Sequence, residues 1–231
     1  MAGRLLPRHA ECMENSSSLF RAASELTDWW DMAVIGGPSE DDNHLAAGYR
    51  FLAIAGVKQW QEASYRTRAH DWAVVPILNA YRHSIELALK AGIRDAAACV
   101  RADGIRDPDA ARDAVEERLA KTHSLKTLTY ELSRWTDMLN LSGYGESAGL
   151  VNQVLDALHG IDESGQTFRY SSVKQGRGKN RVLVPARPDE QAMDFVATVE
   201  ALDEVAGLLI DGLSTMLYEY AEFRRELREY S

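Results

Sequence analysis

Cysteine is scarce in this chain, which has 231 residues and two cysteines, Cys12 and Cys99. Two thiols cannot build a disulfide framework or a four-cysteine zinc site, so we expect both to be reduced, as in a cytoplasmic protein. No apolar run is long enough to span a bilayer, and the N-terminus has no secretory apolar region with a cleavage site. The sequence therefore predicts a cytoplasmic protein that does not enter a membrane.

Positive charge is in deficit, with 26 Lys and Arg against 35 Asp and Glu and a net charge of −9. A field of that sign repels nucleic acid as a whole, although it leaves room for a local basic site. Hydrophobic residues make up 45% of the chain and charged residues 26%, a composition typical of a globular protein with a sizeable core.

Glycine and proline are sparse, 16 and 6 residues, and most lie between long stretches rich in Ala, Leu, Glu and Arg. This pattern predicts an all-α helical bundle. We expect residues 1–66 to form an N-terminal helical pair packed on a helical core of residues 67–231. Helices are expected over 14–32, 44–66, 75–100, 109–121, 124–139, 146–159 and 189–230, with Pro76 in the first turn of the third.

One short β-hairpin is expected within residues 168–186, where the runs FRYSSV and RVLVPA flank KQGRGKN. No acidic residue occurs between positions 165 and 188, although the protein is acidic. The hairpin is therefore a candidate for binding phosphate or RNA, and the alternative is a solvated hairpin that offsets the acidic body. The proposed phosphate-binding residues are Lys174, Arg177, Lys179 and Arg181.

The last expected helix carries apolar residues spaced alternately by four and three positions from Phe195 to Leu227, a sustained heptad seam. The seam fits the long spine helix of an intramolecular bundle. It also fits an interface, because a helix of about 40 residues is ~60 Å long and exceeds a small bundle. We expect a homodimer, or a hetero-complex, through this C-terminal helix.

The helix within residues 75–100 is apolar nearly all round and yet carries Arg82, Glu86 and Lys90 on one face. Charges on a buried helix need partners, and suitable residues follow at His123, Asp162 and Arg169. We predict that Glu86 pairs with Arg169. The expected structural polar network consists of Glu86, Lys90, Asp162, Arg169 and Tyr170.

The run YRHSIELALK, then THSLKTL, then IDESGQTFRYSS, resembles a group of bacterial proteins related to the HEPN superfamily. The resemblance covers about residues 75–172. It implies a HEPN-like helical bundle, RNA cleavage or binding, dimerisation, and a place in toxin–antitoxin, CRISPR or antiphage systems.

Catalytic HEPN ribonucleases use an Arg followed, after four to six residues, by a His, and need no metal or cofactor. The spacing occurs here at Arg4…His9 and Arg118…His123, about as often as chance gives, and the expected C-terminal helix contains no His. If the chain does cleave RNA, the candidate catalytic residues are Arg82, His83 and His123.

The sequence thus supports three functions. The first is a HEPN-like, RNA-associated interaction module that is not catalytic. The second is a metal-independent endoribonuclease toxin with an Arg/His site. The third is an RNA or nucleotide sensor that does not cleave.

Overall fold

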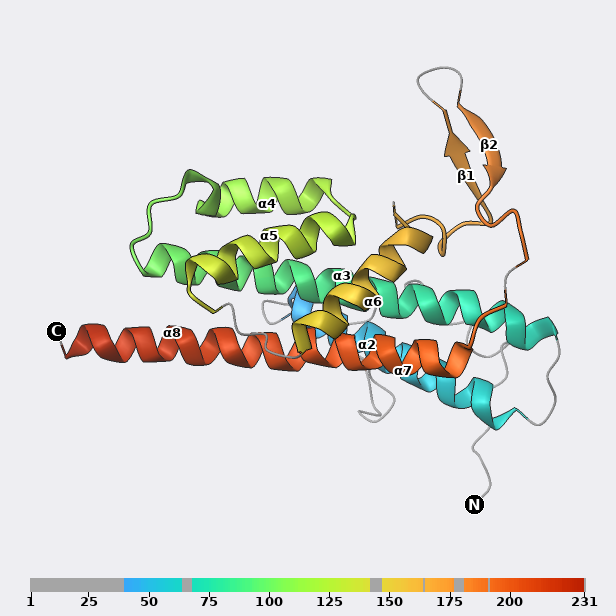
Figure 1. The fold of residues 1–231 in the computed structure, drawn as a ribbon, viewed down its shortest axis with the longest axis horizontal. Helices are drawn as coiled ribbons and strands as arrows, with labels where there is room; N and C mark the ends of the chain where they lie inside the picture. The colour runs from blue at the N-terminus through green and yellow to red at the C-terminus, as the bar shows by residue number, and fades with distance from the viewer. Residues whose placement is uncertain are drawn as a thin grey trace, which may run out of the picture. The chain divides into compact units, whose positions relative to one another are not determined.

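The computed structural model describes residues 40–63, 68–141, 147–163, 165–176, 181–190 and 192–230. Residues 40–231 form one compact unit. The expected all-α bundle with a long C-terminal helix and one hairpin is confirmed (Figure 1). The expected helix 14–32 lies outside the described residues, so the division at residue 66 stays a prediction. The helices are α2 (Asp42–Glu62), α3 (Arg68–Ala102), α4 (Arg112–Lys121), α5 (Leu125–Met138), α6 (Ser147–Ile161), α7 (Phe195–Gly207) and α8 (Ser214–Glu229).

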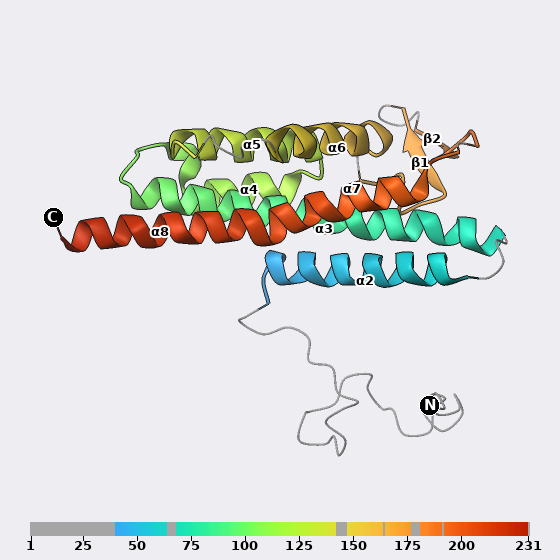
Figure 2. The ribbon, with the colours of Figure 1, turned by 60° about the horizontal axis from the view of Figure 1, so that its bottom comes forward.

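Helix α3 is the central element of this unit. Helix α2 packs along one side of it, α4 and α5 pack on the opposite side, and α7 and α8 run beside it (Figure 2). Its sequence explains this position, because a helix that is apolar nearly all round is stable only when neighbours cover every face. Its fully buried apolar residues include Ile85, Leu89, Ile93, Ala96 and Val100.

Three expected helix starts are wrong, those of α3, α4 and the C-terminal helix. Helix α3 begins at Arg68 rather than near Val75, so Pro76 lies inside the helix. Proline removes one helical hydrogen bond, and the helix tolerates this because Pro76 and the preceding turn at Trp72 are exposed to water. The helix expected over 109–121 is divided into a 3₁₀ turn, Pro108–Ala110, and α4, because the extended ψ angle of 138° at Ala111 separates them.

The C-terminal helix begins at Phe195 rather than at residue 189, because the Asp194 side chain accepts a hydrogen bond from the Ala197 N–H and caps it there. A π-helical segment, Leu208–Leu213, joins α7 to α8. Its Ile210 carbonyl accepts hydrogen bonds from Ser214 Oγ at 2.6 Å and from Asn43 Nδ2 of α2 at 3.3 Å. The Asn43 side chain of α2 thus stabilises the wide turn of the π-helical segment.

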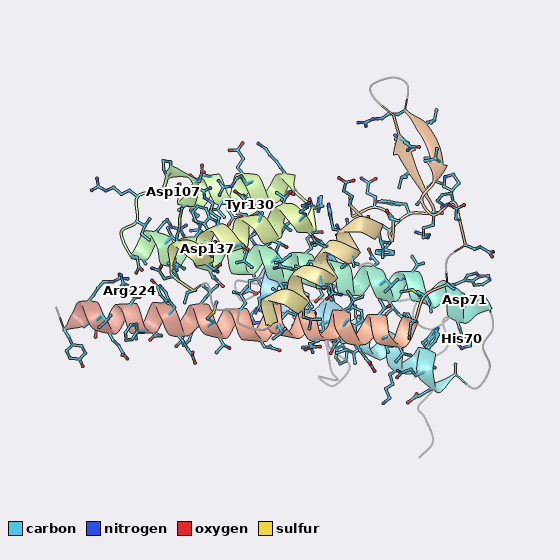
Figure 3. All side chains as sticks on the ribbon, viewed as in Figure 1. His70, Asp71, Asp107, Tyr130, Asp137 and Arg224 are labelled. Carbon is cyan, nitrogen blue, oxygen red and sulfur yellow. The ribbon has the colours of Figure 1, made fainter. Side chains whose placement is uncertain are left out.

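The heptad seam is partly internal. It is buried from Phe195 to Leu213, and the neighbouring Leu217 is buried too, whereas Phe223 is 58% exposed. Asp103, just after α3, forms ion pairs with Arg224 at 2.8 Å and Arg228 at 3.5 Å; Arg224 is labelled in Figure 3. Helix α8 therefore runs past the end of α3, as Figure 1 shows.

The hairpin consists of β1 (Ser172–Gln175) and β2 (Val182–Pro185), which pair antiparallel. It stands out from the helices near the end of α6 (Figure 1). Both strands have an open edge within the described residues, since the sheet has these two strands alone. In the described part of the chain, no helix combines the length and the apolar character that crossing a membrane requires.

Candidate functional site

The Arg82 guanidinium lies at the centre of a buried charge network, with a side chain that is 1% exposed. Its Nη1 donates to Glu86 Oε2 at 2.8 Å, and its Nη2 donates to the His123 carbonyl at 2.7 Å. Its Nε lies 3.0 Å from Asp162 Oδ2, an ion pair without hydrogen-bond alignment. Arg82 thereby ties α3 to the start of α5 and the end of α6. It is enclosed, and a substrate cannot reach it.

Glu86, one turn further along α3, receives three positive or donor groups. Besides Arg82, Lys90 Nζ lies 3.0 Å and His123 Nδ1 lies 2.7 Å from its Oε1. Burial by itself disfavours the charged carboxylate, but the hydrogen bonds from His123, Lys90 and Arg82 outweigh it, so the pKa of Glu86 lies below its ordinary value. Glu86 is therefore ionised at neutral pH.

The turn after α6 closes the network from the other side. Asp162 is fully buried, and its Oδ1 accepts a hydrogen bond from the Thr167 N–H at 2.9 Å. Gly165 has φ +74°, and a Cβ added there would lie 3.0 Å from Arg82 Nη1 and Nη2. This position therefore needs glycine both for its backbone conformation and for the space that the guanidinium occupies.

His123 is the one residue of the network with an accessible side chain, 51% exposed. An ionised carboxylate only accepts hydrogen bonds, so His123 Nδ1 must carry the hydrogen that it gives to Glu86. The neutral ring then has its lone pair on Nε2. This arrangement fixes the tautomer of a half-exposed histidine, as a general base requires.

His83 occupies a different environment. Its Nδ1 lies 3.2 Å from Arg169 Nη2, and its ring meets Tyr49 edge-on with centroids 4.4 Å apart. Because a guanidinium only donates, His83 Nδ1 accepts and the ring is neutral. Burial lowers the pKa of His83, and the positive charge of Arg169 lowers it further. His83 is a packing residue that holds Arg169.

The predicted Glu86–Arg169 pair is wrong. Glu86 is paired with residues of α3 and the α5 start, whereas Arg169 is exposed and contacts His83. Tyr170 is exposed as well, and its carbonyl accepts a hydrogen bond from Arg187 Nη1 at 3.3 Å. The structure brings together Arg82, Glu86, Lys90, His123 and Asp162, and it leaves Arg169 and Tyr170 outside.

On the hairpin, the side chains of Lys174 and Arg181 are exposed, and neither forms an ion pair with another described residue. Arg177 and Lys179 lie outside the described residues, as does the Arg4…His9 spacing. Arg118, the partner of His123 in the other spacing, is bound to Glu131 at 2.6 Å. That arginine therefore serves the packing of α4 against α5.

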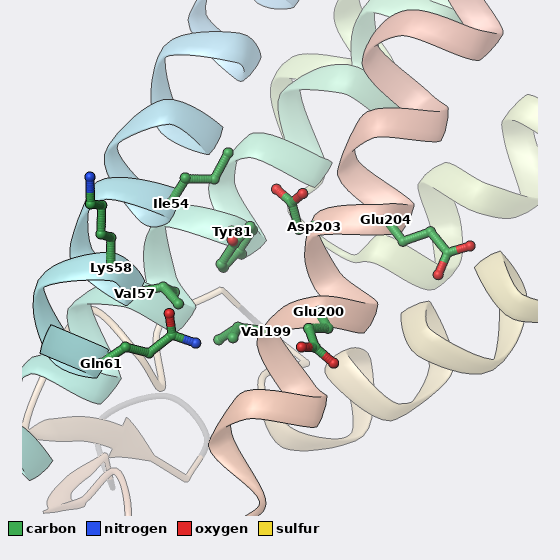
Figure 4. A pocket seen from close by; sticks show the side chains of 9 residues that line it. All are labelled: Ile54, Val57, Lys58, Gln61, Tyr81, Val199, Glu200, Asp203 and Glu204. Atoms are coloured by element: carbon green, nitrogen blue, oxygen red, sulfur yellow. The ribbon is translucent and has the colours of Figure 1, made fainter.

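A second polar cluster, around Arg50 and Asp203, was not predicted from the sequence. Arg50 of α2 donates from Nε and Nη2 to the two carboxylate oxygens of Asp203 in α7, both at 2.9 Å. The buried Tyr81 lies beside Asp203, and burial and that charge raise the pKa of Tyr81 to about 12. The cluster lies beside a hollow of about 350 Å³ between α2, α3 and α7 (Figure 4). No local pattern in the sequence links these residues, which lie on helices far apart in the chain.

No group of three or more His, Cys, Asp or Glu side chains within the described ranges is arranged to hold a metal ion. Comparison with known proteins found no matching family model, curated protein or solved structure.

Proposed function

We propose that this chain is a HEPN-like, RNA-associated interaction module of a bacterial defence or toxin–antitoxin-type system, and that it is not catalytic. The enclosure of Arg82 is the observation that carries the non-catalytic part of this proposal. A ribonuclease needs a cation that reaches the substrate phosphate. Arg82 instead binds Glu86, Asp162 and the His123 carbonyl inside the protein, so it is not available to a substrate. The HEPN-like, RNA-associated part is supported by the resemblance of YRHSIELALK, THSLKTL and IDESGQTFRYSS and by the basic hairpin.

RNA is proposed to bind at the hairpin. Lys174 and Arg181 are exposed there without carboxylate partners among the described residues, so they are free to pair with phosphates. Residues 165–188 contain no acidic side chain that would repel the phosphate backbone of RNA. The hairpin would thus meet RNA locally in spite of the overall charge of −9, and we propose that this takes place in the cytoplasm.

A protein partner, either a second copy or another protein, is proposed to bind the end of α8. Phe223 and Leu227 continue the buried seam but are 58% and 44% exposed, because α3 ends before them. Arg225 and Glu222 flank these apolar side chains, and such a mixture suits an interface with an apolar centre and a charged rim.

An equilibrium titration with labelled single-stranded RNA tests the RNA proposal. The double variant Lys174→Ala/Arg181→Ala is compared with Arg106→Ala/Lys126→Ala, which removes the same charge from exposed positions elsewhere. We expect the hairpin variant to bind about tenfold or more weakly and the control variant to bind like the natural chain. Equal weakening by both variants would show a nonspecific charge effect and contradict the proposal.

A metal-independent endoribonuclease is the second candidate, and the 2.7 Å contact between His123 Nδ1 and Glu86 favours it. His123 Nε2 would take the proton of a 2′-hydroxyl while the 2′-oxygen bonds to phosphorus. The P–O5′ bond breaks, and the protonated histidine gives its proton to O5′. Incubation with total RNA in EDTA decides: cleavage that His123→Ala abolishes would establish the ribonuclease and overturn the non-catalytic assignment.

A further inference from the structure

A hollow of about 780 Å³ lies between the first turns of α3, the end of α6 and the loop that joins β2 to α7. A hollow of this size is within the range of sites that bind small molecules. Its walls are largely apolar and include Trp60, Val75, Leu78, Ile161, Phe168 and Phe195. Walls of this kind suit a flat, apolar ring system that leaves water on binding.

Carboxylates line the same hollow. Asp71 comes from α3, and Asp189 and Asp194 come from the loop before α7. Asp194 is engaged as the cap of α7, since its Oδ1 accepts a hydrogen bond from the Ala197 N–H at 3.1 Å. Asp71 and Asp189 are exposed, and neither forms an ion pair with another described residue. These two carboxylates are therefore available to accept hydrogen bonds from a ligand.

Arg187 adds donors to this set of acceptors, and no other basic side chain of the described residues lines the hollow. Its Nη1 donates to the carbonyls of Thr167 and Tyr170, which hold the guanidinium in place. Nε and Nη2 have no acceptor within the described ranges, so their hydrogens are available to a ligand. The hollow thus offers a ligand both free acceptors and free donors beside apolar walls.

The basic hairpin adjoins this hollow. Ala186, which lines the hollow, directly follows β2, and its N–H donates to the Ser171 carbonyl at 2.9 Å, so the two chains still pair there. The Cα atoms of Arg181 and Arg187 are six residues apart in sequence and so at most about 20 Å apart. Asp71 and the hairpin lie at the same end of the bundle (Figures 2 and 3). A ligand in the hollow can therefore extend to the hairpin.

We propose that this hollow binds a guanine base, and that the base belongs to an RNA strand whose phosphates lie on the hairpin. Guanine carries two neighbouring donors, N1–H and the N2 amine, which suit the carboxylate of Asp71 or Asp189. It also carries two neighbouring acceptors, O6 and N7, which suit the guanidinium of Arg187. Single-stranded RNA is recognised in this manner, through unstacked bases that lie against apolar or aromatic side chains and form hydrogen bonds along their edges.

The distribution of charge selects a nucleotide over other ligands. A simple organic cation would be repelled by Arg187, and a simple acid would be repelled by Asp71 and Asp189. A nucleotide has its donors on the base and its negative charge on the phosphate, and this polarity matches carboxylates in the hollow with Lys174 and Arg181 outside it. The RNA source of the base rests on the proposed function of the hairpin, whereas the recognition of guanine does not.

Calorimetric titration with GMP, IMP, AMP, CMP and UMP tests the recognition of guanine. We expect GMP to bind at least about fivefold more tightly than the other four, including IMP, which lacks the N2 amine. Asp71→Asn/Asp189→Asn should lose this preference, while the control Asp113→Asn/Asp156→Asn, which removes the same charge from exposed positions elsewhere, should keep it. Equal binding of the five nucleotides, no binding of GMP, or an unchanged preference in the Asp71/Asp189 variant would overturn the proposal.

RNA titrations separate a failure of the hollow from a failure of the hairpin. An oligouridine with one guanosine should bind at least about fivefold more tightly than oligouridine alone. Lys174→Ala/Arg181→Ala should weaken the binding of both RNAs and leave the preference for GMP over AMP unchanged. RNA binding that depends on the hairpin but shows no preference for guanosine would overturn the hollow alone. A preference for GMP without any RNA binding would overturn the RNA source together with the proposed function.

Discussion

His123 Nδ1 lies 2.7 Å from Oε1 of the buried Glu86, and this contact joins the accessible part of the site to its interior. Glu86 is at once the anchor of the histidine and the counter-ion of Arg82 and Lys90. One carboxylate therefore determines both the packing of α3 and the orientation of the only half-exposed ring in the network.

Replacing Glu86 by Gln should destabilise the protein by about 3–5 kcal/mol, because the change leaves Lys90 and part of the Arg82 charge buried without a counter-ion. Glu117→Gln is the matched control, since it breaks an exposed i, i+4 pair with Lys121. That change should cost less than about 1 kcal/mol. Urea unfolding measures both, and equal costs would show that the network is not a buried one.

A methyl group at Gly165 should also be costly. Gly165→Ala forces a side chain onto a residue with φ +74° and brings its Cβ to 3.0 Å from the Arg82 guanidinium, so we expect a loss of about 1–3 kcal/mol. Gly160→Ala, in the last turns of α6, has nothing within 4 Å and should be neutral or stabilising by up to about 1 kcal/mol. Thermal unfolding compares the two variants, and a Gly165 variant as stable as the Gly160 variant would refute the close approach.

The stability of the protein should fall as the pH is lowered through the titration of His83. The folded pKa of His83 lies below its ordinary value of 6.5 because burial disfavours the charged ring. Between these two pKa values the unfolded chain binds the proton more readily, so lowering the pH favours unfolding. His83→Gln should lose less stability than the natural chain on going from pH 7.5 to 5.5. Identical losses of stability in the two proteins would show that His83 does not contribute to the pH dependence.

Replacing a side chain by alanine should change the free energy of unfolding differently in the two halves of the C-terminal seam. Leu213 is 1% exposed and packs against Gly92, so Leu213→Ala should cost about 2–5 kcal/mol. Phe223→Ala removes an exposed side chain and should change the free energy of unfolding by less than about 0.5 kcal/mol. A large loss for Phe223→Ala would mean that the seam is internal along its whole length.

The sequence predicts the elements of this fold better than the contacts between them. Helical periodicity and the glycine-containing KQGRGKN turn are local signals, and they locate the central helix and the hairpin. The buried charges of α3 were also predictable, because Arg82, Glu86 and Lys90 interrupt an apolar helix. Two of the three expected partners, His123 and Asp162, do join them. The pairing itself was not predictable, because spacing along one helix does not say which loop packs over it. Glu86 was therefore expected to pair with Arg169, whereas it pairs with Arg82, Lys90 and His123.

The same limit explains the Arg50–Asp203 pair, which joins residues 153 positions apart. The two residues lie on different helices, and no local pattern connects them. The position at which the heptad seam stops being buried could not be predicted either. A heptad pattern is the same whether the partner helix belongs to the same chain or to another.

The salt dependence of RNA binding tests the central claim, that the hairpin is the RNA-binding element, most directly. Each phosphate contact with single-stranded RNA contributes about 0.7 to the slope of log K against log salt concentration. Removing Lys174 and Arg181 together should therefore reduce the magnitude of this slope by roughly 1.4, while Arg106→Ala/Lys126→Ala leaves it unchanged. An unchanged slope for the hairpin variant, or no measurable RNA binding by the natural chain at low salt, would contradict the account.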